Sequence, residues 1–151
     1  MSSFVNLIKI NQPIETVYNW ATVPSYWPKY HPVSKYVTPI VDYSPKPKER
    51  FKEGITILYI NQEIEWTILK IEPPYYFEMD GYVPGFMGGT TKIKYALKSF
   101  QGATIFRREF IITRFNKIME FMDKILIDYF VQNDGVVSLE KMKDFVELSP
   151  K

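Results

Sequence analysis

The spacing of apolar residues changes once along this chain, and that change limits the possible folds more than any other feature. From residue 34 to residue 113, apolar residues recur at every second position, in runs separated by proline and glycine clusters. Such runs predict a succession of antiparallel strands. After Arg114 the spacing becomes helical, and apolar residues cover about half of the helix circumference. So wide an apolar face needs a large surface to cover it.

The alternating runs set approximate limits for the strands. Turn signals separate several of them, at Asn61-Gln62, Pro73-Pro74 and Gln101-Gly102. The expected strands lie at about 4–10, 34–43, 50–60, 63–72, 75–82, 90–99 and 103–113.

Helices are expected on either side of the main run of strands. Pro13 is tolerated in a first helical turn, so a short helix should follow it to about Ala21, with another turn near 25–30. The long C-terminal helix should kink or break briefly at Asn133-Asp134-Gly135, because glycine inside a helix costs roughly 1 kcal/mol relative to alanine. Ser138 would then cap the resumed helix.

Composition restricts the class of partner. The chain has 151 residues, which suits one domain, and its net charge of +2 includes no basic block, which argues against nucleic acid. The lack of cysteine excludes disulfides, thiolate metal ligands and a cysteine nucleophile, and is compatible with a reducing cytoplasm. No secretory signal is visible, and no segment approaches the ~20 apolar residues that span a bilayer. We therefore expect a cytoplasmic protein without a transmembrane segment.

Two segments resemble one known superfamily. The run INQPIETVYNWATVPSYWPKYHP, from Ile10 to Pro32, and the run SLEKMKDFVE, from Ser138 to Glu147, are similar to the opening and the final helix of START-like (SRPBCC) proteins, particularly the polyketide cyclase/dehydrase branch. The resemblance implies one domain over residues 1–151 with the α+β helix-grip fold. In that fold a curved antiparallel sheet of about seven strands surrounds a long C-terminal helix, and two short helices join the first two strands. It also implies a mainly apolar cavity.

Arg108 is the charged residue with the clearest functional interpretation. Alternation over 103–113 groups it with Phe106 and Phe110, so its guanidinium should point inward. A buried charge costs several kcal/mol unless it is paired. Either Glu78 or Asp80 supplies that pair, or an anionic ligand does. Alternatively, Arg108 lies at the sheet edge or in a structural ion pair.

The cavity walls should come from the inner sides of the later strands and from the long helix. Trp20, Trp27 and the single histidine, His31, are assigned to packing or to the surface, and no metal or cofactor is expected. The aromatic and methionine side chains of the walls would equally fill a closed core. The expected ligand-binding residues are Trp66, Tyr76, Glu78, Asp80, Tyr82, Tyr95, Phe106, Arg108, Met119 and Met122.

The glycine-rich run GYVPGFMGG, residues 81–89, joins two strands. A phosphate-binding loop leads from a strand into a helix, so that interpretation is rejected. The run forms either a flexible lip over the cavity, carrying Phe86 and Met87, or an ordinary hairpin loop.

These patterns favour binding or transport of a hydrophobic small molecule, such as a lipid-, polyketide- or sterol-like compound. The alternative is an enzyme of the polyketide cyclase/dehydratase type, in which Glu78 or Asp80 moves protons in the same cavity. A third possibility is an interaction module with a vestigial cavity. The sequence leaves the ligand, the catalytic residues and the oligomeric state open.

Overall fold

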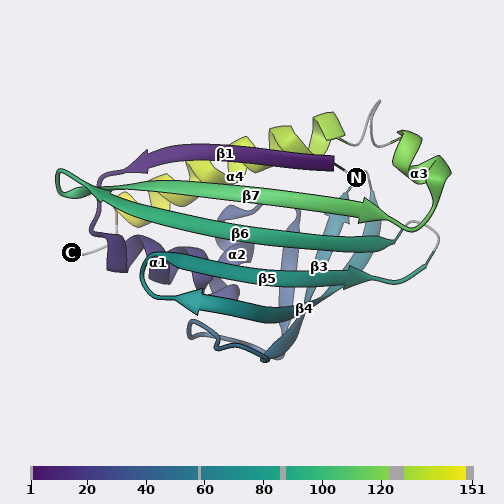
Figure 1. Ribbon diagram of the computed structural model, residues 1–151, viewed down its shortest axis with the longest axis horizontal. Helices are drawn as coiled ribbons and strands as arrows, with labels where there is room; N and C mark the ends of the chain where they lie inside the picture. Colours follow the sequence, from purple (N-terminus) through teal and green to yellow (C-terminus); the bar gives the residue numbers. More distant parts are fainter. Residues whose placement is uncertain (1, 58, 86–87, 123–127, 149–151) are drawn as a thin grey trace.

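One curved antiparallel sheet makes up most of the molecule (Figure 1). The structure is a computed structural model that describes residues 2–57, 59–85, 88–122 and 128–148, with the backbone alone at 122 and 128–134. The order of the seven strands is β1-β7-β6-β5-β4-β3-β2, so the first strand pairs with the last. The strands are β1 (Ser2–Ile10), β2 (Ser34–Thr38), β3 (Arg50–Ile57), β4 (Ile60–Glu72), β5 (Tyr76–Val83), β6 (Gly89–Phe100) and β7 (Ala103–Arg114).

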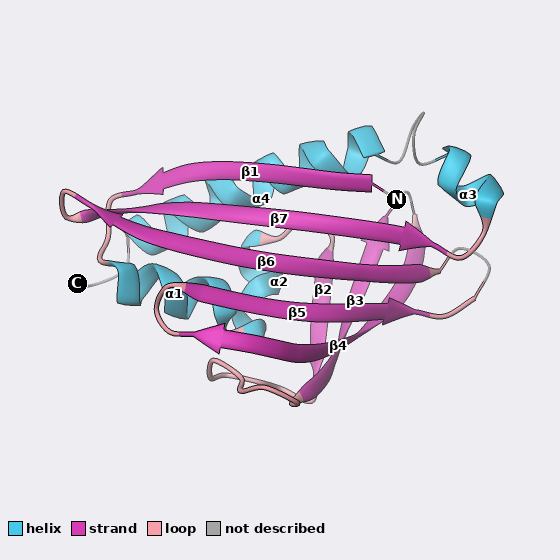
Figure 2. Ribbon diagram, in the orientation of Figure 1, coloured by secondary structure: helices cyan, strands magenta, loops and turns pink. Residues whose placement is uncertain are grey.

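Helices pack on one side of this sheet, which we call its inner face. In Figure 2, α1, α2 and α4 lie behind β1, β7, β6 and β5. The expected α+β arrangement, with its seven-stranded antiparallel sheet and C-terminal helix, is confirmed. The helices are α1 (Ile14–Thr22), α2 (Trp27–Tyr30), α3 (Lys117–Met122) and α4 (Asp128–Glu147), with a 3₁₀ turn at Pro24–Tyr26.

Alternation along the strands separates the inner face from the outer face. In β4, Ile64, Trp66 and Ile68 are buried, whereas Glu65 between them is exposed. The inner residues are removed from water because the helices cover only that face. The predicted inward orientation of Trp66 is confirmed.

The hairpin between β3 and β4 differs from the prediction. Its last cross-strand pair is Ile57 with Ile60, and Asn61 and Gln62 belong to β4, so the turn expected at Asn61-Gln62 is wrong. The observed register sets Phe51 directly opposite Trp66 on the inner face. A buried cross-strand pair of aromatic residues contributes more than the turn preference of two polar residues.

β2 is shorter than the strand expected over 34–43. It ends at Thr38. Pro39 follows, and because proline has no backbone N–H it cannot extend the ladder. β2 therefore forms a short edge of the sheet.

The last helix, α4, runs through Gly135 without a break, so the interruption expected at Asn133-Asp134-Gly135 is wrong. A Cβ at Gly135 would lie 3.2 Å from Asn6 Oδ1 and 3.3 Å from Arg108 Nη2. The glycine thus lets two side chains approach the helix closely. Ser138 lies inside the helix rather than at an N-cap, and its hydroxyl donates to the Gly135 carbonyl at 2.8 Å. Tertiary contacts override local helix propensity here.

Candidate ligand-binding pocket

A pocket of about 120 Å³ opens on the inner face, between strands β3 to β7 and the helices α2 and α4. We call it the inner pocket. An apolar cavity of about 150 Å³ is large enough to bind benzene, so the enclosed part of the inner pocket has room for about one aromatic ring, and a second fused ring can extend through its open side. Its apolar walls include Ile55, Ile64, Trp66, Met79, Ile93 and Phe110.

Arg108 of β7 is buried at the inner face, as its position in the alternation predicts. Its Nη2 donates to the Gly135 carbonyl at 2.6 Å and to the Ser138 hydroxyl at 2.9 Å. The guanidinium carbon lies 4.9 Å from the centre of the Phe110 ring. Burial lowers the pKa of Arg108. Its hydrogen-bond acceptors are therefore neutral oxygens, in place of the expected Glu78 or Asp80.

Glu53 of β3 is a pocket residue that the sequence interpretation missed. Its side chain is only 5% exposed, and its Oε1 accepts a hydrogen bond from Trp66 Nε1 at 3.1 Å. Burial raises the pKa of Glu53 to about 7, although the hydrogen bond from Trp66 and the nearby hydroxyl of Ser34 oppose this shift. A signal was present in the sequence, because Glu53 shares its side of the strand with Phe51 and Ile55.

Four further titratable residues line the inner pocket, namely Tyr30, His31, Tyr95 and Arg114. Burial, supported by the charge of Arg108, lowers the pKa of His31 to about 3, so its imidazole is neutral near pH 7. Burial raises the pKa of Tyr95 to about 12 and raises that of Tyr30 well above its ordinary value. The Tyr30 hydroxyl donates to the Trp20 carbonyl at 3.1 Å. The pocket therefore combines apolar walls with several buried groups that stay uncharged.

Trp27 also lines the inner pocket, although the sequence interpretation assigned it to packing. It has both roles, since its ring lies 5.5 Å from that of Phe51 and its Nε1 donates to the Ala21 carbonyl at 2.9 Å. The short helix α2 thus lines the inner pocket in addition to packing against the core.

Four residues expected at the site face the other way. Phe77 and Met79 are buried on the inner face of β5, and successive residues of a strand point to opposite faces. The prediction that the intervening residues point inward, and that one of their carboxylates pairs with Arg108, is therefore wrong. The buried apolar pair was the signal that identifies the inner side of this strand. The four misplaced residues are Tyr76, Glu78, Asp80 and Tyr82.

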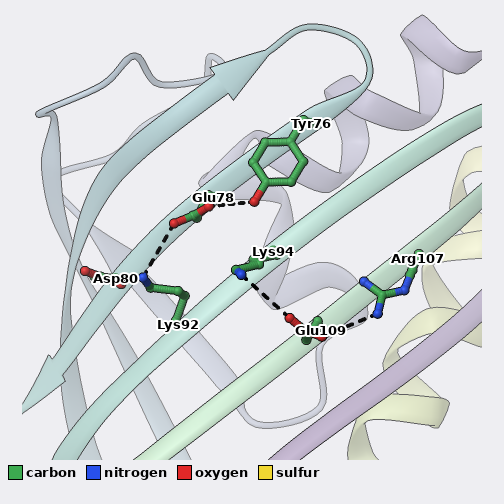
Figure 3. Close-up of polar contacts among 7 residues, drawn as sticks. All are labelled: Tyr76, Glu78, Asp80, Lys92, Lys94, Arg107 and Glu109. Atoms are coloured by element: carbon green, nitrogen blue, oxygen red, sulfur yellow. Dashed lines mark hydrogen bonds and ion pairs between the residues drawn. The ribbon is translucent and has the colours of Figure 1, made fainter.

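The outer face carries a network of opposite charges, which we call the outer charge ladder (Figure 3). Lys92 Nζ lies 3.6 Å from Glu78 Oε2 and 3.8 Å from Asp80 Oδ1. Lys94 and Arg107 both approach Glu109, at 3.9 Å and 3.3 Å. These pairs account for Glu78 and Asp80 without any contact to the inner pocket. The ladder consists of Glu78, Asp80, Lys92, Lys94, Arg107 and Glu109.

Of the other residues predicted to bind the ligand, some line the inner pocket and others do not. Trp66 and Tyr95 line the inner pocket. Phe106 is buried in the core behind it, with its ring 5.2 Å from that of Tyr95, and Met119 is buried in α3. The side chain of Met122 lies outside the described part of the chain, as do the proposed lip residues Phe86 and Met87.

None of the described helices is long and apolar enough to cross a membrane. The sequence matches no protein-family model and no curated protein.

Solved structures with the same architecture cover almost the whole chain. CV1439 from Chromobacterium violaceum has a TM-score of 0.76 at 12% identity, over 97% of this chain and 98% of its own. MLL2253 from Mesorhizobium loti has a TM-score of 0.73 at 14% identity, over 99% and 100%. Ara h 8.0201, which is Bet v 1-like and of the SRPBCC superfamily, has a TM-score of 0.67 at 13% identity, over 96% and 97%. At these identities the likeness establishes the fold, and this chain has the helix-grip fold.

Proposed function

We propose that this START-like protein binds an apolar small molecule in the inner pocket, as a binding protein or carrier. The observation that carries the proposal is an apolar pocket that encloses a few buried polar groups, including Glu53 and Tyr95. Small-molecule sites in proteins commonly have this composition. The Bet v 1-like neighbour supports the same class of function.

The proposed contacts follow from the positions of the side chains. Trp66 and Tyr95 would touch the ligand, and Arg108 would act on its polar end. Phe106 and Met119 would support the walls from behind. A volume of about 120 Å³ suits a compact ring system better than a long acyl chain.

Native mass spectrometry of protein purified from cells tests this function. We expect a bound small molecule that mild denaturation releases. Ile112→Trp should fill the pocket and abolish this bound mass, since Ile112 lines the inner pocket. Ile111→Trp is the matched control, because Ile111 lies next to it on the outer face. Wild-type protein that carries no ligand and binds no compact apolar probe, such as 2-naphthamide, would contradict the proposal.

A second candidate is an enzyme of the cyclase/dehydratase type, and Glu53 is the observation that favours it. A carboxyl group whose pKa is about 7 is suited to accept and return a proton at neutral pH. The carboxylates first considered for this role, Glu78 and Asp80, lie on the outer face. Turnover of the co-purified ligand that Glu53→Gln abolishes would establish the enzyme, and an unchanged ligand would support the carrier.

A further inference from the structure

Arg108 is a buried cation with no anionic partner among the side chains that the structure describes. Its side chain is 2% exposed, and its Nη2 donates to the neutral oxygens of Gly135 and Ser138. Its Nε has no hydrogen-bond partner, and no carboxylate of the described residues lies within ion-pair distance. A guanidinium in this position has lost its hydration without gaining a countercharge. The site therefore favours a ligand that brings negative charge.

The guanidinium of Arg108 lies against the wall of the inner pocket. It sits over the Phe110 ring at 4.9 Å and holds the Gly135 carbonyl at 2.6 Å, and both of these residues line the pocket. Tyr95, another lining residue, is near enough for the charge of Arg108 to oppose the rise in its pKa. The polar end of a ligand in the pocket would lie within reach of this charge.

Glu53 faces the same space from β3. The polar and charged groups around Glu53 come from several other described elements. The imidazole of His31 is neutral near pH 7, so the positive charge around the pocket comes from two residues of β7, Arg108 and Arg114. Arg108 lies near Tyr30 and Tyr95, whose pKa values its charge lowers and the charge of Glu53 raises. The surrounding groups are Ser34 of β2, Trp66 of β4, Tyr30 of α2, Tyr95 of β6, Arg108 and Arg114 of β7, and His31, which follows α2.

We propose that the inner pocket takes a compact apolar acid whose carboxylate is bound by Arg108, and that Glu53 holds a proton while this anion is bound. The inference rests on the proposed function and specifies its ligand class. When Glu53 is ionised, its charge repels the ligand carboxylate and offsets the attraction of Arg108. When Glu53 is protonated, the pocket keeps the positive charge of Arg108 and can donate a hydrogen bond to the anion.

The pKa values of the pocket groups determine the pH at which the affinity for the ligand should change. The pKa of Glu53 is about 7, whereas those of His31 and Tyr95 are about 3 and about 12. Glu53 is therefore the described pocket group that changes charge near neutral pH. Affinity for an apolar carboxylate should fall as the pH rises through about 7.

Two probes of the same shape test this proposal: 2-naphthoate, which is an anion, and 2-naphthamide, which is neutral. Their affinities for the wild-type protein are measured by calorimetry at about pH 6 and about pH 8. We expect 2-naphthoate to bind on the order of tenfold more tightly at the lower pH, since the protonated fraction of Glu53 is about tenfold larger there. The affinity of 2-naphthamide should be the same at both values.

Substitutions of Glu53 and Arg108 test whether these two side chains cause the difference in binding. Glu53→Gln should keep the affinity for 2-naphthoate high at both pH values, because the amide cannot ionise. Arg108→Met should lower that affinity by on the order of tenfold while 2-naphthamide binds as before. Arg107→Met is the matched control, since Arg107 is the next residue on the strand and lies in the outer charge ladder. The binding of 2-naphthamide also reports whether each variant is folded.

The possible outcomes distinguish failure of the proposed anion site from failure of the proposed apolar binding function. Equal and pH-independent binding of both probes would overturn the anion site and leave the apolar binding function standing. Unchanged binding of 2-naphthoate by Arg108→Met would also overturn it. If neither probe binds to wild-type protein, the proposed function itself fails. If Arg108→Met does not fold, the pH profiles of wild type and Glu53→Gln decide the question without it.

Discussion

Arg107 and Arg108 are neighbours on β7, yet their surroundings are opposite. Arg107 belongs to the outer charge ladder, where it is 42% exposed and lies 3.3 Å from Glu109. Arg108 is 2% exposed and donates to neutral oxygens. One step along a strand thus separates a hydrated, paired charge from a desolvated one that has no countercharge among the described side chains.

The two faces of the sheet differ in what a charged group contributes. On the outer face, water screens each ion pair, which contributes about 0–1 kcal/mol. On the inner face, desolvation dominates, and it moves the pKa of Glu53 to about 7 and that of His31 to about 3. The outer charges keep that face of the sheet solvated, whereas a ligand role for the inner charges is what we propose.

The largest difference between the faces should appear on removing aromatic rings from β5. Phe77→Ala should lower the free energy of unfolding by about 3–5 kcal/mol, because Phe77 is fully buried on the inner face. Tyr82→Ala should lower it by less than about 1 kcal/mol, because Tyr82 is 44% exposed on the outer face. Urea unfolding of both variants measures the difference, and equal losses would show that the outer face also carries core packing.

The pH dependence of stability tests the desolvation of Glu53. Its pKa is raised from 4.5 in the unfolded chain to about 7 in the folded protein. The stability that this group contributes is therefore complete below about pH 4.5 and is lost as the pH rises through about 7, by about 3 kcal/mol.

His31 opposes this change over part of the range, because its pKa is lowered and its contribution is lost as the pH falls. The quantity to measure is therefore the difference in unfolding free energy between wild type and Glu53→Gln at each pH. Wild type should lose stability relative to the variant as the pH rises. Glu63→Gln is the control, since Glu63 is 40% exposed. A Glu53→Gln difference as flat as that of the control would contradict the assigned pKa.

The two arginines give a smaller but more specific test. Arg108→Met should raise the stability of the ligand-free protein by about 2 kcal/mol, because methionine removes a buried charge that has no countercharge. Arg107→Met should change it by less than about 1 kcal/mol. Thermal and urea unfolding measure both. A large loss of stability in Arg108→Met would assign Arg108 to structure, with its bonds to Gly135 and Ser138 as the main contribution.

The sequence predicts the fold well because strand and helix periodicity are local properties. Alternation identified the inward orientation of Trp66 and of Arg108 correctly. It fails for Glu78 and Asp80. Tyr76 and Tyr82 share their side of the strand and favour it as the inner side, whereas the structure buries Phe77 on the opposite side. Two aromatic residue types on opposite faces of one strand make the local pattern ambiguous.

The partners of Arg108 could not be predicted in the same way. They lie 27 and 30 residues further along the chain, and the register of α4 against β7 determines which backbone carbonyl meets the guanidinium. The sequence marks Gly135 only as a poor helix former. The desolvation of Glu53 likewise depends on residues from several elements, although its place beside Phe51 and Ile55 marks it as inward.

Gly135→Ala tests whether α4 must leave room for Arg108 at this position. Of the substitutions considered, it should have the smallest effect on stability. Alanine adds roughly 1 kcal/mol of helix propensity, but its Cβ would lie 3.3 Å from Arg108 Nη2 and 3.2 Å from Asn6 Oδ1. Both neighbours are ends of side chains that can move by a few tenths of an ångström, so the net change in stability should stay within about 1 kcal/mol. The displaced guanidinium should bind 2-naphthoate about two- to threefold more weakly. Val136→Ala, at an exposed position of the same helix, should leave that affinity unchanged. A full gain of helix stability in Gly135→Ala with unchanged affinity would show that the glycine is not needed to position Arg108.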